Sequence, residues 1–280
     1  MALGSLILVL LLGAGAMLHA QDKAQALRYT FAGTKDAPAR RAISIKQTLD
    51  VQLGAGAKAQ KVEAIVDAVV EQSLTGTKGE DLDLQITFMD LTSSLKAQGQ
   101  PVPGGGQLGA MRMSTVLSPQ GKVQSIFTES VSPQFNRTLG LLKDAFLHTL
   151  PVVPKDAIAV GHTWSDTSTS SHKEDNVELA IDIKRDYTLS SMENDGKLAR
   201  IGVVLDLKMS SAVSDAEDSG ASYKRSGNGS GKGTIVFDLE RGVVTDASIE
   251  LSFKSTDGNG ASQQSKLSIT VTPEKANNKP

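Results

Sequence analysis

The 280-residue sequence contains no cysteine. Disulfides, a cysteine nucleophile and lipid attachment through a cysteine are therefore excluded. Aromatic residues make up only 4% of the chain and tryptophan occurs once, which disfavours stacking platforms for bases or sugars. The formal net charge is −2, with acids and bases interspersed. Because phosphate backbones bind to a concentrated basic surface, nucleic acid is not expected as a partner.

Charged side chains are absent from the first twenty residues. An apolar run, Leu6 to Leu12, leads through small residues to Ala20, and polar sequence begins at Gln21. This pattern predicts a secretory signal peptide over residues 1–20 with cleavage near Ala20, although the leading residues lack the usual Lys or Arg. The apolar core is too short to serve as a mature transmembrane helix. We therefore expect a soluble, secreted or periplasmic protein with no transmembrane anchor.

Alternating apolar residues run through most of the mature chain and predict β-strands. The alternation covers these segments: 26–33, 43–53, 82–88, 111–115, 123–127, 177–187, 198–209, 234–238, 243–251 and 266–271. Residues 60–74 fit either a strand or a helix, and the many β-branched residues favour the strand. Residues 97–109 are expected to form a flexible loop, residues 212–232 a mobile loop or frayed hairpin, and residues 274–280 a disordered tail.

One convincing helix lies in the middle of the chain, over residues 133–149. Ser132 can cap it, Pro133 suits its first turn, and Pro151 ends it. Its apolar face carries residues at spacings of four, three, four and four: Phe135, Leu139, Leu142, Phe146 and Leu150. The expected fold is mainly β (α+β): a curved antiparallel sheet or open half-barrel with the one central helix packed on its concave face. A single domain, residues 21–273, has halves 25–130 and 150–273 joined by this helix.

The two halves share a short pattern of strand, glycine turn and strand. Residues 115–123 carry it around Gly121, and residues 234–244 carry it around Gly242. Either the halves are an internal repeat or the similarity reflects convergent hairpin chemistry.

A motif follows the helix: Leu150-Pro-Val-Val-Pro154, then Val160-Gly161-His162-Thr163-Trp164. With the signal peptide and the β-rich halves, it resembles a family of secreted bacterial proteins of unknown function, which carry Leu-Pro-x-x-Pro and then Val-Gly-Asp-x-Trp after a helix. His162 stands where that family has Asp, which puts any role of the carboxylate in doubt here. The architecture more loosely resembles the half-barrels of periplasmic lipoprotein carriers, a likeness of fold that implies no activity.

Catalytic and metal-binding patterns are weak. Residues 225–234 resemble a phosphate-binding loop, but Ser226 replaces the first glycine and a strand follows where a helix should begin. His162, His172, Glu174 and Asp175 match no known metal-ligand spacing, so surface histidines are the simpler interpretation. The strand and turn carboxylates suggest no acid–base pair. We expect no enzyme, no catalytic residues, no metal and no cofactor.

Two single residues have alternative roles. Trp164 either stacks on a ligand or anchors the loop after the helix to the sheet, and the anchor is favoured. His148, near the end of the helix, would interact favourably with the helix dipole when charged.

The sequence therefore favours a non-enzymatic binding protein that holds an apolar or lipid-like ligand between helix and sheet. Its candidate ligand-binding residues are Phe135, Leu139, Leu142, Phe146 and Trp164. A structural or protein–protein interaction module of the cell envelope with a packed core is the first alternative, and a hydrolase with an unrecognised site is the second.

Overall fold

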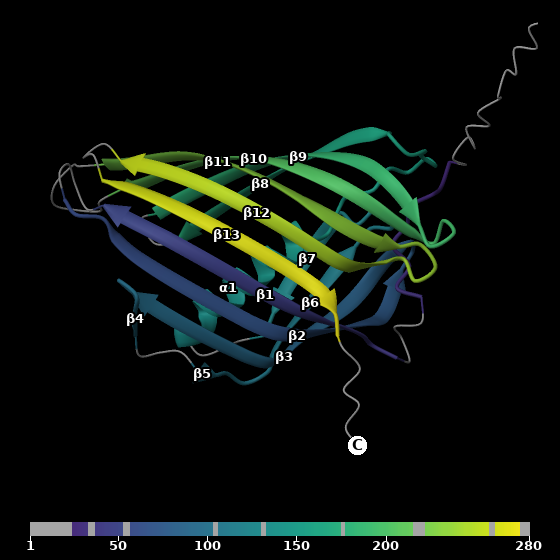
Figure 1. Ribbon diagram of the computed structural model, residues 1–280, viewed down its shortest axis with the longest axis horizontal. Coiled ribbons are helices and arrows are strands. Elements are labelled where there is room, and N and C mark those ends of the chain that lie inside the picture. Colours follow the sequence, from purple (N-terminus) through teal and green to yellow (C-terminus); the bar gives the residue numbers. More distant parts are fainter. Residues whose placement is uncertain are drawn as a thin grey trace, which may run out of the picture.

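The computed structural model describes residues 24–32, 37–52, 57–102, 106–129, 133–174, 177–214, 222–257 and 261–274. These residues form one large sheet and one helix (Figure 1). The expected signal peptide, Ser132 and almost all of the expected tail lie outside the described residues. Within the described part of the chain, no helix is long and apolar enough to cross a membrane.

The described residues form thirteen strands, whose order along the chain is interrupted once, by α1 between β7 and β8. Their bounds are β1 (Ala39–Gln52), β2 (Gln60–Lys78), β3 (Asp81–Ala97), β4 (Gln100–Pro101), β5 (Gly106–Gln107), β6 (Met111–Leu117), β7 (Val123–Thr128), α1 (Pro133–His148), β8 (Thr163–Glu174), β9 (Val177–Glu193), β10 (Leu198–Ser214), β11 (Ser222–Asp238), β12 (Val243–Asp257) and β13 (Ser262–Pro273).

All pairings in the sheet are antiparallel, in the order β7-β6-β3-β2-β1-β13-β12-β11-β10-β9-β8. The first and last long strands lie side by side, with Arg41 opposite Pro273 and Gln52 opposite Ser262. This seam joins the two halves of the chain. In the described residues the order ends at β7 on one side and β8 on the other, so the sheet is not closed.

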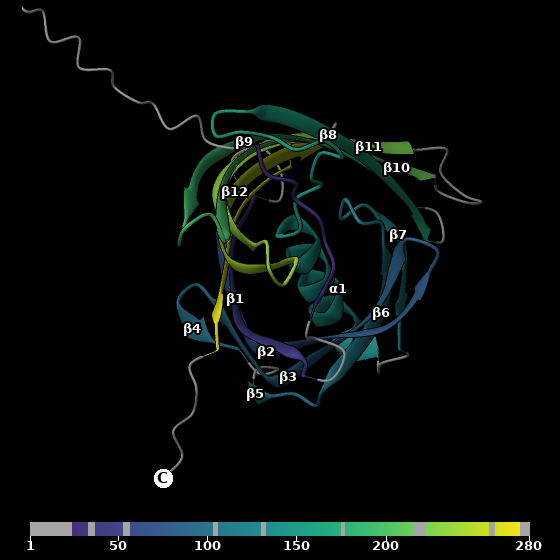
Figure 2. The ribbon, with the colours of Figure 1, turned by 90° about the vertical axis from the view of Figure 1, so that its right-hand side faces the viewer.

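The sheet curves around α1, which Figure 2 shows inside the curve. Successive residues of a strand point to opposite faces, and in strands such as β6 and β10 the buried side chains all lie on one face. Leu139, Leu142, Ala145 and Phe146 of the helix belong to the same buried apolar cluster as the inward residues of the strands. The helix and the sheet therefore share one core.

The structure confirms most of the predicted elements. Residues 60–74 lie in β2, so the strand interpretation of this ambiguous segment is correct. The helix runs over Pro133–His148, as its periodicity predicts. The two glycine hairpins are also present, as β6–β7 and β11–β12.

The strand predicted for residues 26–33 is wrong. Leu27, Tyr29 and Phe31 are buried, at 3%, 1% and 1% exposure, but the segment pairs only by an isolated bridge between Gln25 and Ile158. It crosses one end of the curved sheet, as its purple trace in Figure 2 shows. Alternation here marks a segment packed across the interior, which buries every second side chain without joining a sheet.

Two predicted loops contain strands. The loop expected over residues 97–109 includes the two-residue strands β4 and β5, which pair with β3, while residues 98–99, 102 and 108–109 belong to no strand and residues 103–105 lie outside the described residues. For residues 212–232 the hairpin alternative is correct in the described part, because residues 212–214 belong to β10 and residues 222–232 to the paired β11, while residues 215–221 lie outside the described residues. β8 was not predicted, because its Ser/Thr-rich sequence lacks apolar alternation.

Glycines explain why β11 does not look like a strand. Gly227, Gly229, Gly231 and Gly233 occupy its inward positions, and β12 side chains lie over their backbone. A Cβ atom on Gly231 would lie 2.3 Å from Cδ2 of Leu251, and one on Gly229 would lie 2.9 Å from Cδ2 of Phe253. Glycine is required here by close packing rather than by a turn.

Candidate functional site

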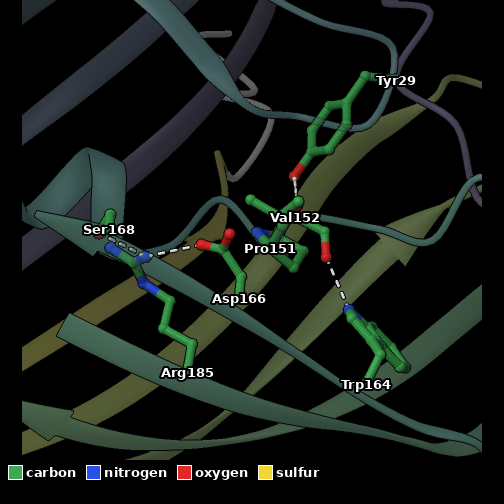
Figure 3. A network of polar contacts seen from close by, with 7 residues as sticks. All are labelled: Tyr29, Pro151, Val152, Trp164, Asp166, Ser168 and Arg185. Atoms are coloured by element: carbon green, nitrogen blue, oxygen red, sulfur yellow. Dashed lines mark hydrogen bonds and ion pairs between the residues drawn. The ribbon is translucent and has the colours of Figure 1, made fainter.

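The corner after α1 is held through its backbone. The hydroxyl of Tyr29 donates to the Pro151 carbonyl at 3.0 Å, and Nε1 of Trp164 donates to the Val152 carbonyl at 2.7 Å (Figure 3). The Val153 amide donates to the Gln120 carbonyl at 2.8 Å. The two prolines fix φ at this corner, so its carbonyls are fixed acceptors for groups from the N-terminal segment and from β8.

Trp164 has the anchoring role that the sequence favours. Besides its hydrogen bond to Val152, its ring stacks on Tyr187, the opposite residue on β9, at a centroid distance of 5.3 Å. The His162 ring stacks at 6.2 Å, so it takes part in an aromatic contact. His162 is exposed. The side chains of His172 and Glu174 and the whole of Asp175 lie outside the described part of the structure.

A buried ion pair lies beside this corner. Nη1 of Arg185 on β9 is 3.1 Å from Oδ2 of Asp166 on β8 and donates to Oγ of Ser168, also at 3.1 Å (Figure 3). The Arg185 and Asp166 side chains are 10% and 19% exposed. A buried charge needs such a partner, because its desolvation costs several kcal/mol.

The pKa of His148, at the end of α1, is affected by the charge of this arginine. Burial, followed by the charge of Arg185, lowers the pKa of His148 to about 4. Its Nδ1 is buried and makes no hydrogen bond to any described residue. The imidazole is therefore neutral at pH 7, and the charged interaction with the helix dipole that the sequence suggested is absent.

Sequence reasoning missed this pair, although a signal for Arg185 was present. Val177, Leu179, Ile181 and Ile183 alternate, and Arg185 continues the same face. A charged residue at an inward position indicates a buried partner. Asp166 could not be identified, because β8 was not recognised as a strand.

The predicted ligand-binding residues of the helix lie in the core. Leu139, Leu142 and Phe146 are 5%, 0% and 4% exposed. The side chain of Phe135 lies outside the described part of the structure. The structure thus brings three of the five candidates together inside the sheet, with Trp164 at the adjoining corner.

The inward face of the sheet stays apolar beyond this core but becomes only half-buried. One cross-strand row, here called the apolar row, runs from β9 to β2 and contains Ile183, Leu207, Phe253, Leu49 and Val62. Gly229 lies in it between Leu207 and Phe253, and Ser265 lies in it between Phe253 and Leu49. Each of its five apolar residues is of intermediate burial, whereas the inward residues Leu205 and Ile249 are fully buried. The row lies toward the end of the sheet opposite the N-terminal segment.

Comparisons with known proteins identify a family whose function is unknown. A model described as DUF6263, a family of unknown function, matches residues 102–244, just over half of the chain. That range includes α1 and the motif from Leu150 to Trp164. No curated protein matches the chain. A crystal structure of Pseudomonas aeruginosa OccK1 (OpdK) aligns over 84% of this chain and 98% of its own, with 5% identity and a TM-score of 0.16, and this likeness carries no structural argument.

Proposed function

The chain belongs to DUF6263, a family of unknown function, and we propose that it is a secreted, non-enzymatic binding protein for an apolar ligand. The ligand lies inside the curved sheet and contacts the apolar row. Leu139, Leu142 and Phe146 form the floor of this site, and Trp164 holds the corner beneath them.

The observation that carries this proposal is the half-buried apolar row. Leu207 of this row packs against the core cluster but remains partly exposed. Contiguous exposed apolar surface is unusual in a monomer and marks binding sites. Completing the burial of such side chains stabilises a complex by about 25 cal/mol per Å² of apolar surface.

A structural or protein–protein interaction module with a packed core remains the second candidate. The burial of Leu139, Leu142 and Phe146 favours it, since those side chains already have protein neighbours. A hydrolase ranks last. Secretion rests on the predicted signal peptide, and the absence of catalysis rests on the weakness of the catalytic patterns in the sequence.

The test is native mass spectrometry of the chain from Gln21, expressed in a bacterial periplasm, before and after organic extraction. Extractable, stoichiometric extra mass supports a carried ligand and identifies its class. A bare mass, together with no thermal stabilisation by fatty acids or phospholipids, refutes the carrier and leaves the packed module.

Two matched variants on β10 test where the ligand binds. Leu207→Lys puts a charge on the inward apolar row, whereas Ser210→Lys puts the same charge on the outward, exposed face of the same strand. We expect the extra mass to disappear from the Leu207 variant and to remain in the Ser210 variant. Equal retention in two folded variants would place the ligand elsewhere.

A further inference from the structure

A trough crosses the outward face of the sheet, on the side away from α1. Its volume is about 690 Å³. It spans β1, β13, β12, β11 and β10, which lie side by side in Figure 1. The lining side chains at outward positions are Lys46, Thr48, Val204, Ser230, Lys232, Glu250, Ser252, Lys266 and Ser268.

Strand register arranges these side chains in two neighbouring cross-strand rows. One row contains Lys46, Ser268, Glu250, Lys232 and Val204 in that order. The next row contains Thr48, Lys266, Ser252 and Ser230 and continues to Asp206 on β10, which does not line the trough. Lys266 and Lys232 therefore lie on the two strands that flank β12, with Ser252 and Glu250 between them.

The trough is positively charged. Three lysines and one glutamate line it, which gives a charge of +2. Among the described residues, none of these four side chains forms an ion pair, whereas neighbouring Lys61 and Lys184 pair with Glu63 and Asp186 at 2.8 Å. Lys46 lies near enough to Glu63 to lower the pKa of that carboxyl, together with Lys61. Lys232 and Lys266 are thus the two cations left to bind a ligand.

We propose that this trough binds a phosphate-bearing ligand. The neighbouring strands are about 4.8 Å apart, so the flexible stems of Lys232 and Lys266 bring two ammonium groups to an anion over β12. The Ser252 hydroxyl supplies a further donor. The negative charge of a phosphate monoester complements the net positive charge of the lining.

An apolar contact lies next to the charged end. Val204 is 53% exposed, unusually for an aliphatic side chain in this protein, and it lines the trough beside Lys232. This combination suits an amphiphile whose phosphate contacts the lysines and whose chain contacts Val204. The site is separate from the apolar row, because the rows occupy opposite faces of the sheet.

The test is calorimetric titration of the folded chain from Gln21 with three probes: inorganic phosphate, dodecyl phosphate below its micelle concentration, and dodecanol as the uncharged comparison. Lys232→Gln/Lys266→Gln removes both cations. Lys254→Gln/Lys208→Gln is the control, because it removes two exposed outward lysines of β12 and β10 that do not line the trough. Hydrogen bonds to charged groups contribute about 1.5–3 kcal/mol each, so the first double variant should bind dodecyl phosphate at least ~10-fold more weakly than the control.

The outcomes separate the sources of the phosphate. If Val204→Ser weakens the binding of dodecyl phosphate and leaves the binding of inorganic phosphate unchanged, the ligand is an amphiphile. Equal affinity for the two phosphates supports a free phosphate compound. Binding of neither phosphate, or equal affinities of the two double variants, overturns the proposal. Dodecanol binding that survives the lysine substitutions reports only on the interior site, so the failure of one proposal is distinguishable from the failure of the other.

Discussion

At the scale of single residues, the glycines differ sharply in what surrounds them. Gly79 and Gly121 both have positive φ, at 65° and 82°. A Cβ on Gly79 would meet nothing within 4 Å, but one on Gly121 would lie 2.3 Å from Cε2 of Tyr29 and 2.8 Å from the Pro151 carbonyl. Gly121 is therefore required both by its backbone and by its neighbours.

Gly121→Ala should accordingly destabilise the protein more than Gly79→Ala. The left-handed conformation alone costs an alanine roughly 1–2 kcal/mol, and forcing a methyl group into a packed region adds about 1–3 kcal/mol. Urea unfolding should show a loss of roughly 2–5 kcal/mol for Gly121→Ala. For Gly79→Ala it should show only the conformational cost of roughly 1–2 kcal/mol. Equal losses would mean that Tyr29 does not pack against this turn.

His148 predicts a specific dependence of stability on pH. Its pKa in the folded state is about 4, lowered by burial and by Arg185, against 6.5 ordinarily. Between these values the unfolded chain binds a proton that the folded chain does not, so the contribution of His148 is complete above pH 6.5 and is lost as the pH falls to 4. At 1.36 kcal/mol per pH unit, the loss is up to about 3 kcal/mol.

The measurement compares the free energy of unfolding of the wild type and His148→Gln between pH 4 and 7. Carboxylates titrate in both proteins, so the difference between the two curves isolates the histidine. We expect the wild type to lose more stability than the variant as the pH falls. Parallel curves would show that the imidazole is solvated in the folded protein.

At the scale of elements, the N-terminal segment explains the resemblance between the two glycine hairpins. The Tyr29 amide donates to the Pro119 carbonyl in the first turn, and the Thr30 amide donates to the Gly242 carbonyl in the second. A Cβ on Gly242 would lie 2.4 Å from the Thr30 amide nitrogen. Each half of the chain therefore supplies one glycine turn, and the two turns hold the same segment.

Leu27→Ala and Arg28→Ala test whether this segment is part of the core. Leu27 is 3% exposed, and truncating such a side chain costs roughly 2–5 kcal/mol. The Arg28 side chain is 53% exposed, and its contact with Glu80 is long, at 3.6 Å, so its removal should change stability by less than about 1 kcal/mol. Thermal and urea unfolding measure both variants. Similar small effects would show that the segment is detached in solution.

The sequence could specify these elements only where side chains follow a period. Ile43, Ile45 and Leu49 face one side, and their alternation predicts a strand over residues 43–53, which overlaps β1 but misses its first four residues. In β11 the inward positions are glycines, which provide no hydrophobic signal, so a strand resembled a loop. In residues 26–33 alternation was present but the hydrogen-bonding partners were turns, which periodicity cannot reveal.

At the scale of the whole molecule, the candidate sites depend on pairings between distant parts of the chain. The apolar row joins Ile183 to Leu49 through strands on both sides of the seam, and the trough joins Lys46 to Lys232 in the same way. The periodicity predicted that Leu49 and Ile183 face inward, but not that they lie in one row. Register between the halves comes from the β1–β13 pairing, which no local pattern specifies.

This seam predicts that the two halves unfold together. β1 pairs with β2 of the first half and with β13 of the second, and the N-terminal segment binds a turn from each.

Trp164, the only tryptophan, lies in the second half, whereas Ile86 is fully buried in the first. Ile86→Ala should cost about 2–5 kcal/mol. In urea it should shift the unfolding transition by the same amount whether Trp164 fluorescence or far-UV circular dichroism is followed, because a two-state protein gives coincident transitions. If the halves were independent, the fluorescence transition would stay in place while the circular dichroism transition split, and the expected single domain over residues 21–273 would have to be divided at the helix.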